Sequence, residues 1–550
     1  MDFPFSTRRQ ASFIRGFLCS LTIACSGLAF APASYAAQRV TLRFGPFEQS
    51  VAISDLEQFA KTGRLPSSLQ LYAPILTPQV RELLLRHLQL DPAVGDKLIG
   101  ELVRSPSGKG IVESLGTAIP GSTVQSLQSA IALAARQANG LSVIGFLRSY
   151  PQENLTVDAS RALALAVQVN PTYWQSQALG SLLQRELPVS NSTPFRATFD
   201  PAAVGQQKVQ LQTIVLRDKQ RNRNITVDLY TSQNHDSQQP LVVMSHGFGA
   251  NRRFLGYLAR HLASHGLTVA AIEHPGSDIK AVTAAVNKGN LSNLMPASEY
   301  VELPKDVSFV LDELAKLNTQ PGSFQGKLNT DNVTAIGHSL GGYTALALVG
   351  GEVNIGELRK YCQDSVGVGQ APGDWLQCAA AKLPDQKLNF ADQRVKSALV
   401  LNPLIGSLFG KTGLNQVTKP VLILTGTEDS LTPSLTHQLR PFTQLHGTKY
   451  LLTAIGGTHL SIGDPANLAN IATTTTIVKE RLGSETQPLR QLLQGVSLAF
   501  IKQQTNEAKI YQPFLTPAYA QSLSTAALPL RLNSELPGSI KPWLEFVMTY

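Results

Sequence analysis

Six short, continuously apolar runs between residues 240 and 457 most constrain how this chain can fold. They are 240–247 (PLVVMSHG), 267–276 (LTVAAIEHPG), 332–339 (NVTAIGHS), 397–403 (SALVLNP), 420–429 (PVLILTGTED) and 449–457 (KYLLTAIGG). Helical stretches separate them. Strands that are apolar on both faces and alternate with helices form a parallel sheet covered on both sides. We therefore predict an α/β fold with a mostly parallel, doubly wound sheet. In such a sheet, reactive groups gather outside the carboxyl ends of the strands.

The rest of the chain divides into regions of different texture. Before the six runs, 208–218 and 224–232 are β-rich and predict a hairpin. Residues 38–190 carry helix-start patterns such as Ser54-x-x-Glu57, and we expect a separate, all-helical N-terminal domain there. The expected boundaries are a signal peptide at 1–36, the helical domain at 38–190, a linker at 191–207, the α/β domain at 208–505 and an irregular tail at 506–550.

Ser339 is the candidate nucleophile. It directly follows an apolar run, precedes an Ala- and Leu-rich helical stretch, and has Gly337 and Gly341 on either side at two residues' distance. A sharp strand-to-helix turn needs small residues at both positions, because side chains there would collide with the neighbouring strand and helix. The Gly-x-Ser-x-Gly pattern alone is only modestly specific, but its place between a buried strand and a helix favours a nucleophile over a serine in an ordinary turn.

A serine hydroxyl needs a base, and the base needs an acid that orients it. In this architecture the chain order is serine, acid, histidine. His459 follows the last apolar run, so we expect it to be the base rather than His437 or His446. Asp429 ends the preceding run and is the expected acid, with Glu428 as the neighbour that could be mistaken for it.

Two backbone N–H groups complete the expected site. The segment SHGFGA (245–250) closes the first apolar run and can aim the N–H of Phe248 at a developing oxyanion. The N–H of Leu340, next to the nucleophile, is the second expected donor. His246 and His338 fit structural roles better than catalytic ones. His246, His274 and Asp278 lack the tight spacing of metal ligands, so we expect no metal and no organic cofactor.

The first residues resemble a signal peptide. Arg8, Arg9 and Arg15 precede an apolar run at 16–31, and small residues before Ala37 fit a cleavage site. The apolar run is short for a membrane-spanning helix, which argues against an uncleaved anchor. We expect a periplasmic or secreted protein, exported by a Sec or Tat route. The formal charge is +9, but Lys and Arg do not cluster with aromatic residues, which argues against nucleic acid as a partner.

An exported chain favours disulfides. Cys362 and Cys378 remain after removal of the leader, and we expect them to pair. The alternative is two free, buried thiols. Both cysteines lie in 351–396, which is long for a plain connection, and we interpret this segment as a cap over the site. Phe248, Trp375 and Leu376 are candidate pocket residues, for which core packing is an equal alternative.

These motifs resemble the α/β-hydrolase superfamily, and within it the dienelactone-hydrolase-like and platelet-activating-factor-acetylhydrolase-like branches. The resemblance rests on MSHGFGANRR, AIEHPGSD, IGHSLGGYTAL, LTGTEDSLTP and GGTHLS, and covers about 240–465. The whole layout is similar to exported cyanobacterial hydrolases whose N-terminal domain has no assigned function. The resemblance implies the same Ser339, Asp429 and His459 triad. Acetylhydrolases of that branch carry their acid where this chain has Asn402, a departure that bears on phospholipid specificity.

The expected function is hydrolysis of a small-molecule or lipid carboxylic ester through an acyl-enzyme on Ser339. Phospholipase A2- or acetylhydrolase-type activity is the narrower alternative within this chemistry. Peptidase, acyltransferase or haloperoxidase chemistry could use the same triad. A different alternative is a non-catalytic envelope-binding protein, in which the N-terminal domain contacts a membrane peripherally. The sequence leaves the acyl chain, the alcohol and the oligomeric state open.

Overall fold

The computed structural model describes residues 37–44, 47–73, 76, 78–85, 87–88, 115–135, 141–158, 161–162, 171–187, 195–233, 237–287, 295–364, 371–468, 480–540 and 544. The expected signal peptide and much of the expected linker lie outside these residues. Contacts divide the chain into two compact units: Met1–Gln70 with Leu84–Ala162, and Leu71–Leu83 with Leu163–Tyr550. In the described part of the chain, no helix combines the length and the apolar character needed to cross a bilayer.

The first unit is not all-helical, so that prediction is wrong. It contains a three-stranded sheet in the order β2–β1–β5, with β1 at Arg39–Phe44, β2 at Phe47–Ala52 and β5 at Asn154–Asp158. β1 runs antiparallel to β2 and parallel to β5. The short pair β3 (His87–Leu88) and β4 (Leu141–Ser142) adds a second, two-stranded sheet.

Helices of this unit include α2 (Ile53–Thr62), α6 (Val124–Ala135) and α7 (Val143–Ser149). α2 lies where the sequence predicts a helix, but Ala52 is its N-cap and Ser54 does not cap it. Gly63 ends α2 in the left-handed conformation, with φ of 71°. Two further helical segments, η1 (Ser67–Tyr72) and α3 (Pro78–Leu85), lie at or across the division between the units.

The second unit is built on a nine-stranded sheet, as predicted for an α/β-hydrolase fold. Its strand order is β16–β15–β14–β13–β10–β8–β9–β7–β6. The six apolar runs become β8 (Leu241–Ser245), β9 (Thr268–Ile272), β10 (Val333–His338), β13 (Val395–Leu401), β14 (Val421–Gly426) and β15 (Lys449–Ala454). These six strands are mutually parallel. The prediction of a mostly parallel sheet is confirmed.

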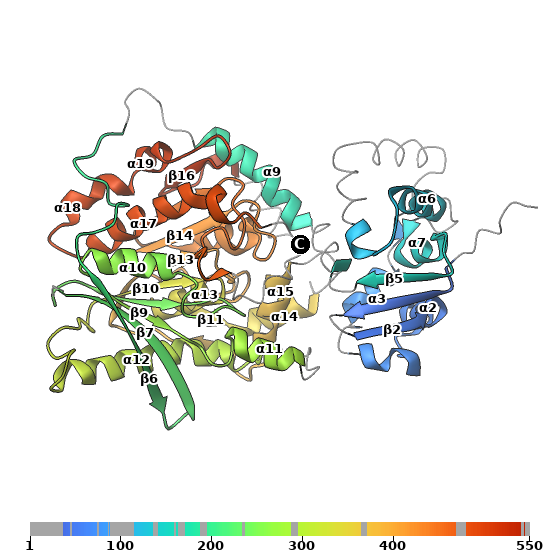
Figure 1. Cartoon of the computed structure of the whole chain (residues 1–550), viewed down its shortest axis with the longest axis horizontal. Helices are drawn as coiled ribbons and strands as arrows, with labels where there is room; N and C mark the ends of the chain where they lie inside the picture. Colours follow the sequence, from blue (N-terminus) through green and yellow to red (C-terminus); the bar gives the residue numbers. More distant parts are fainter. Residues whose placement is uncertain are drawn as a thin grey trace, which may run out of the picture. The chain divides into compact units, whose positions relative to one another are not determined.

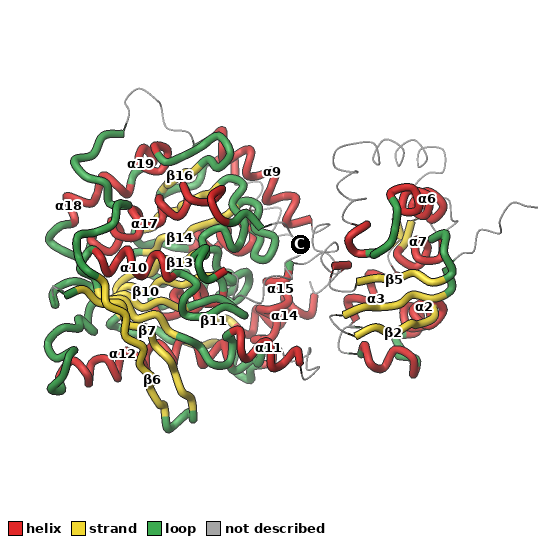
Figure 2. The backbone as a smooth tube through the Cα atoms, in the orientation of Figure 1, coloured by secondary structure: helices red, strands yellow, loops and turns green. Residues whose placement is uncertain are grey.

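Antiparallel strands close both edges of this sheet. β6 (Val209–Asp218) and β7 (Arg223–Ser232) form the expected hairpin, and β7 pairs with β9. Figure 2 shows this hairpin as two long strands that extend from one edge of the sheet. At the other edge, β16 (Leu530–Asn533) pairs with β15. The tail that we expected to be irregular therefore supplies the ninth strand.

Helices cover both faces of the sheet. On one face lie α10 (Gly256–Ser264) and α17 (Gln487–Lys502), and on the other lie α12 (Glu299–Thr319) and α13 (Leu340–Leu348) (Figure 1). The central strand β10 is buried throughout, with Ala335 in one core and Ile336 in the other. Burial on both faces explains why these strands have continuous rather than alternating apolar sequences.

The helix α9 (Pro171–Glu186) belongs to the second unit, so the predicted boundary at residue 190 is wrong. Leu179 and Leu183 are fully buried in the same core as the sheet. At Gly180, an added Cβ would lie 2.9 Å from Oγ1 of Thr427, which shows how closely α9 approaches the end of β14. The helix was assigned to the wrong domain because its amphipathic pattern does not reveal its packing partner.

The remaining helices and short strands of the second unit lie between the elements described above or follow them in the chain. They are α11 (Ile279–Asn287), β11 (Glu352–Asn354), α14 (Ile355–Asp364), α15 (Pro372–Cys378), η3 (Ala379–Lys382), β12 (Lys387–Asn389), η4 (Leu435–Leu439), α16 (Arg440–Gln444), η7 (Gly483–Thr486), α18 (Ala508–Tyr511), η8 (Gln512–Leu515), α19 (Pro517–Ser522) and η9 (Gly538–Ile540). The strand order reverses beside β8, because β9 is added on one side and β10 on the other. Such a switch point opens a crevice at the carboxyl ends of the strands, where α/β proteins place their ligands.

Candidate active site

Ser339 occupies a strained turn between β10 and α13. Its φ of 54° and ψ of −116° lie in a region that L-residues rarely adopt. A Cβ at Gly337 would lie 1.9 Å from the main-chain oxygen of Gly341, and a Cβ at Gly341 would lie 2.1 Å from that of Ser245. The backbone can therefore make this turn only with glycine at both positions. Ser339 exposes 6% of its surface.

Asp429 and His459 form a buried ion-pair contact at the ends of β14 and β15. The Oδ2 atom of Asp429 lies 2.7 Å from Nδ1 of His459. The carboxylate also accepts hydrogen bonds from the N–H groups of Leu431 and Thr432 and from the Thr432 hydroxyl, over 2.8 to 2.9 Å. Because Nδ1 faces the carboxylate, Nε2 is the nitrogen of His459 left to act on a substrate or nucleophile.

The electrostatics of this pair stabilise the imidazolium form of His459 relative to an ordinary histidine. Burial opposes the charged imidazolium, but the adjacent Asp429 carboxylate outweighs burial and raises the pKa of His459 above its usual value. Glu428, the neighbour of Asp429, is half-buried, and burial raises its pKa. Of the two acids, the structure brings Asp429 to the histidine.

The other downstream histidines lie elsewhere. Nδ1 of His437 accepts a hydrogen bond from the Gly406 N–H over 3.0 Å, and its Nε2 lies 3.1 Å from Asp374. His446 is exposed on the turn before β15. Neither contacts Asp429 or Ser339, which leaves His459 as the histidine at the site.

The loop that carries His459 is fixed from both sides. His338 donates from Nε2 to the main-chain oxygen of His459 over 3.0 Å, and burial holds the pKa of His338 well below its usual value. Asn402 donates from Nδ2 to the same oxygen and to that of Thr458, over 3.2 Å each. On the far side, Glu480 accepts from the N–H of Leu460 over 3.0 Å. Glu480 lies in no recognisable motif, so its place at the site could not be predicted from the sequence.

The loop after β8 approaches the nucleophile closely. A Cβ at Gly247 would lie 3.0 Å from Cβ of Ser339, so a side chain here would crowd the nucleophile. Among the described residues, neither the N–H of Phe248 nor that of Leu340 donates a hydrogen bond. Two unused backbone donors beside a serine in a strained turn match the arrangement of an oxyanion hole.

The structure also contains a second serine–histidine–aspartate set, which the sequence did not reveal. Oγ of Ser245 lies 2.8 Å from Nε2 of His274, whose Nδ1 lies 3.1 Å from Oδ2 of Asp306. Ser245 is the last residue of the fully buried strand β8 and has no left-handed backbone. Asp306 lies inside α12, where no sequence motif marks it. The geometry of a strained, glycine-flanked turn is found at Ser339 and not at Ser245.

The insertion 351–396 packs beside the acid loop. The N–H of Gly373, in α15, donates to the main-chain oxygen of Leu431 over 2.8 Å, two residues after Asp429. Phe248 and Leu376 are partly buried against the core of this unit, and Tyr300 donates from its hydroxyl to the Leu376 oxygen over 2.7 Å. The sulfurs of Cys362 and Cys378 are bonded, with the Cα atoms 5.8 Å apart.

Metal ligands are absent from the described residues: no group of three or more His, Cys, Asp or Glu side chains could hold an ion. His246, His274 and Asp278, which the sequence left as a weak metal alternative, have other partners. His246 accepts a hydrogen bond from the N–H of His274 over 3.0 Å, and Asp278 accepts from the N–H of Ala281 over 2.8 Å.

Comparison with known proteins gives two family matches on separate parts of the chain. Residues 36–158 match the family described as "Alpha/beta hydrolase of unknown function (DUF1400)", and residues 205–307 match "Platelet-activating factor acetylhydrolase, isoform II". Apart from residues 71–83, the first match falls on the first compact unit. The second covers the loop of Phe248 and ends before Ser339.

Two curated relatives are similar to part of the chain. The platelet-activating factor acetylhydrolases of Canis lupus familiaris and Cavia porcellus are 30% identical over 137 residues and 31% identical over 134 residues. Each alignment covers 20% of this chain and 31% of the relative. The chain thus matches about a third of the length of these relatives.

The nine-stranded sheet and the strained serine turn define an α/β-hydrolase fold, and one of the two family matches carries that name. Within that class, the second match and the curated relatives support a place in the platelet-activating-factor-acetylhydrolase-like branch.

Proposed function

We propose that this chain is an exported serine hydrolase that cleaves carboxylic esters through Ser339, His459 and Asp429. The observation that carries the proposal is the buried contact of 2.7 Å between Asp429 and His459, at the same sheet edge as Ser339 in its strained turn. A carboxylate, a histidine and a serine in this chain order are the parts of an acyl-transfer triad.

In the proposed reaction, Oγ of Ser339 attacks the ester carbonyl while Nε2 of His459 takes the hydroxyl proton. The resulting imidazolium is stabilised by Asp429, which already raises the pKa of His459 against the effect of burial. The N–H groups of Phe248 and Leu340 receive the oxyanion. Collapse of the tetrahedral intermediate breaks the ester bond, and His459 returns the proton to the leaving alcohol. Water then attacks the acyl-enzyme by the same route. These steps use no metal or organic cofactor.

A narrower candidate is acetylhydrolase-type activity on a phospholipid. It is favoured by the two relatives that carry the name platelet-activating factor acetylhydrolase. Asn402 bears against it, because this residue directly follows β13, where the acetylhydrolases that this chain resembles carry their acid. In this chain the asparagine donates to the loop of His459 instead. A short-chain phospholipid ester compared with a simple alkyl ester of the same acyl group would separate the two activities.

Export is the second part of the proposal. It is supported by the leader-like residues before Ala37 and by the pairing of Cys362 with Cys378, since structural disulfides persist in oxidising compartments. We place the protein in the periplasm or outside the cell. For the first unit, we propose that it contacts a membrane surface.

The proposal is tested by covalent labelling with a fluorophosphonate. Wild-type protein and Ser245→Ala should label, whereas Ser339→Ala should not, because Ser339 is the serine proposed as nucleophile, in the strained turn after β10 at the sheet edge that carries Asp429 and His459. Labelling that survives in Ser339→Ala and disappears in Ser245→Ala would show that the nucleophile is Ser245, in the second serine–histidine–aspartate set. A folded wild-type protein that does not label would favour the non-catalytic, envelope-binding alternative.

A further inference from the structure

We propose that His246 is a positioning residue that aims the Phe248 N–H at the oxyanion, and that His274 and Asp306 hold His246 in place. This inference rests on the proposed function, because it takes the Phe248 N–H as an oxyanion donor. It assigns a role to the second serine–histidine–aspartate set, which the acyl-transfer mechanism leaves unused.

The key contact is made to the peptide that carries the donor. Nδ1 of His246 lies 2.8 Å from the main-chain oxygen of Gly247, which also accepts a hydrogen bond from the N–H of Ala250 over 3.1 Å. The Gly247 carbonyl and the Phe248 N–H belong to one planar, trans peptide group, so they point in opposite directions. Holding the carbonyl toward His246 therefore fixes the direction of the Phe248 N–H.

The protonation of His246 follows from its second contact. The N–H of His274 donates to Nε2 of His246 over 3.0 Å, so this nitrogen has no proton. The proton of the neutral ring must then lie on Nδ1, from which it is donated to Gly247. Burial and the nearby His274 lower the pKa of His246 to about 4, which keeps the ring neutral at physiological pH.

His274 contacts Ser245 and His246, the two residues that precede Gly247 and Phe248. Its main-chain N–H bonds His246, and its ring nitrogen Nε2 lies 2.8 Å from Oγ of Ser245. The other ring nitrogen lies 3.1 Å from Oδ2 of Asp306, which is fully buried. The Asp306 carboxylate on α12 thus holds the ring of His274 in place. Holding the ring also restrains the main-chain N–H of the same residue, which is the donor to His246.

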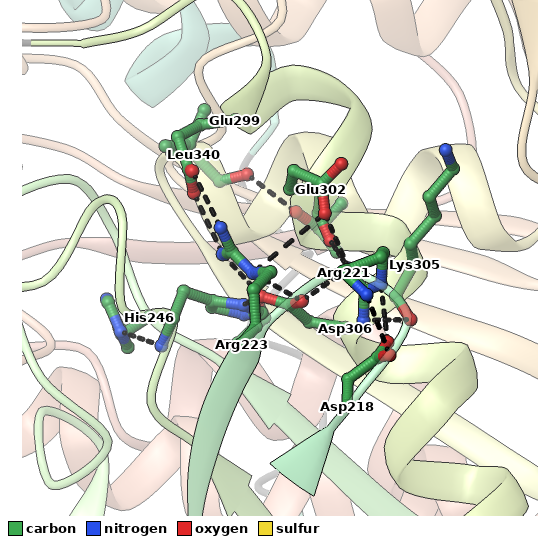
Figure 3. Close-up of polar contacts among 12 residues, drawn as sticks. Asp218, Arg221, Arg223, His246, Glu299, Glu302, Lys305, Asp306 and Leu340 are labelled. Carbon is green, nitrogen blue, oxygen red and sulfur yellow. Dashed lines mark hydrogen bonds and ion pairs between the residues drawn. The ribbon is translucent and has the colours of Figure 1, made fainter.

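Asp306 is itself fixed by two arginines from the β6–β7 hairpin. Arg221 reaches its Oδ1 over 2.7 Å, and Arg223 reaches its Oδ2 over 2.9 Å (Figure 3). Arg223 also bonds Glu299, and a Cβ at Gly276 would lie 2.0 Å from that carboxylate. The loop after β9 therefore packs directly on the same buried charge cluster. Figure 3 shows both arginines among these carboxylates, with His246 beyond them.

Two substitutions at His246 separate its two contacts. In His246→Asn the amide nitrogen takes the place of Nδ1, so the donor to Gly247 is kept. In His246→Gln the amide reaches the place of Nε2, so the bond to His274 can be kept and the donor to Gly247 is lost. Loss of one oxyanion donor lowers kcat about 10²- to 10³-fold. We expect His246→Gln to lower kcat by about 10²-fold with KM within about threefold, and His246→Asn to retain most of kcat.

The matched readout is the affinity of a trifluoromethyl ketone that forms a tetrahedral adduct with Ser339. Its affinity should fall in His246→Gln by about the same factor as kcat/KM, because both depend on the oxyanion donors. His261→Gln and His261→Asn are the controls, since His261 is a buried histidine of α10 outside this chain of contacts. They should leave kcat and inhibitor affinity within about twofold of wild type. The inference is overturned if folded His246→Gln retains wild-type kcat and inhibitor affinity, or if both His246 variants lose them equally.

A measurement on the unmodified protein covers variants that do not fold. Nitrogen-15 NMR of labelled histidine side chains should show His246 as the neutral ring with the proton on Nδ1. A proton on Nε2, or a charged ring at neutral pH, would overturn the inference. This readout does not depend on activity. If Ser339→Ala remains active, the proposed function falls, and the tautomer still decides whether His246 donates to Gly247.

Discussion

The side chain of Asn402 bonds the main chain of His459: its Nδ2 lies 3.2 Å from the His459 oxygen. Its Oδ1 accepts a hydrogen bond from the N–H of Gly426 over 3.1 Å. One amide thus ties the end of β13 to the loops after β14 and β15, which carry the candidate acid and base. An asparagine stands where the related branch has its acid, and it acts as a brace between two loops.

The first prediction concerns this brace. Asn402 has a φ of 42°, a conformation that asparagine and glycine tolerate better than other residues. Asn402→Gly should keep the backbone conformation and remove the bonds, costing about 1–3 kcal/mol for the buried groups left unpaired. Asn402→Ala should cost about 1–2 kcal/mol more, because its backbone is also strained. Urea midpoints of the two variants check the order. Equal midpoints would show that the backbone conformation contributes nothing.

A second prediction concerns Asp429 and the pH dependence of activity. The Asp429 carboxylate raises the pKa of His459 against the effect of burial, so kcat/KM should rise with pH through a midpoint above 6.5. Asp429→Asn removes the cause of this rise. The midpoint should then move down, and kcat should fall by about 10⁴-fold because the ring loses its orientation and its counter-charge.

The measurement is a pH profile of kcat/KM for the wild type and Asp429→Asn, with Glu428→Gln as the adjacent control. Glu428→Gln should leave the midpoint and kcat nearly unchanged. If Glu428→Gln instead lowers kcat as much as Asp429→Asn, the acid has been assigned to the wrong residue.

The third prediction concerns stability in acid. Burial lowers the pKa of His246 to about 4, that of His261 to about 3, and that of His338 well below 6.5. Between those values and about 6.5, the unfolded chain binds protons that the folded chain does not, so stability falls as pH is lowered through this range. His459 acts in the opposite sense, because its pKa is raised. The stability that His459 contributes is fully present below about pH 6.5, and it is lost as pH rises through the pKa of His459 in the folded protein.

Urea unfolding at pH 7.5 and pH 5 tests this balance. Burial also lowers the pKa of His265, so four histidines with lowered pKa values stand against one with a raised pKa, and we expect a lower midpoint at pH 5. His261→Gln should reduce the difference between the two midpoints, because it removes one of the four histidines with a lowered pKa. Equal wild-type midpoints at both values would contradict the burial of neutral histidines.

The fourth prediction concerns Cys362 and Cys378. A disulfide that closes a loop of this size stabilises a protein by about 3 kcal/mol in the chain-entropy model. Reduction, or the double change Cys362→Ser with Cys378→Ser, should lower the urea midpoint accordingly. Thiol titration of denatured protein before and after reduction gives the direct check: two additional thiols should appear only after reduction. Two reactive thiols without reduction would show that the cysteines are free.

The fold of the second unit was predictable because each central strand is buried on both faces. Six uninterrupted apolar runs leave little choice of architecture, and all six became parallel strands. The first unit was misjudged because its strands are short and half-exposed. Val40 and Leu42 alternate with polar residues in β1, but the stronger helix signal of α2 follows directly and dominated the interpretation.

The site was predictable only where a residue follows a strand. Ser339, Asp429 and His459 each lie at the carboxyl end of one, so topology alone brings them to one edge. Glu480 and Asp306 approach the site from segments with no motif, and only three-dimensional packing reveals them. β16 was missed for a similar reason, because Leu530 and Leu532 make too short a pattern to distinguish a strand from a loop.

The most direct test of the central claim is hydrolysis of p-nitrophenyl esters from acetyl to palmitoyl by the wild type and Ser339→Ala. We expect turnover by the wild type and a loss of at least about 10³-fold in Ser339→Ala at every chain length. The acyl chain length that is hydrolysed fastest would then indicate the size of the pocket that binds the acyl group. Turnover that is equal in the two folded proteins would contradict the assignment of Ser339 as the nucleophile.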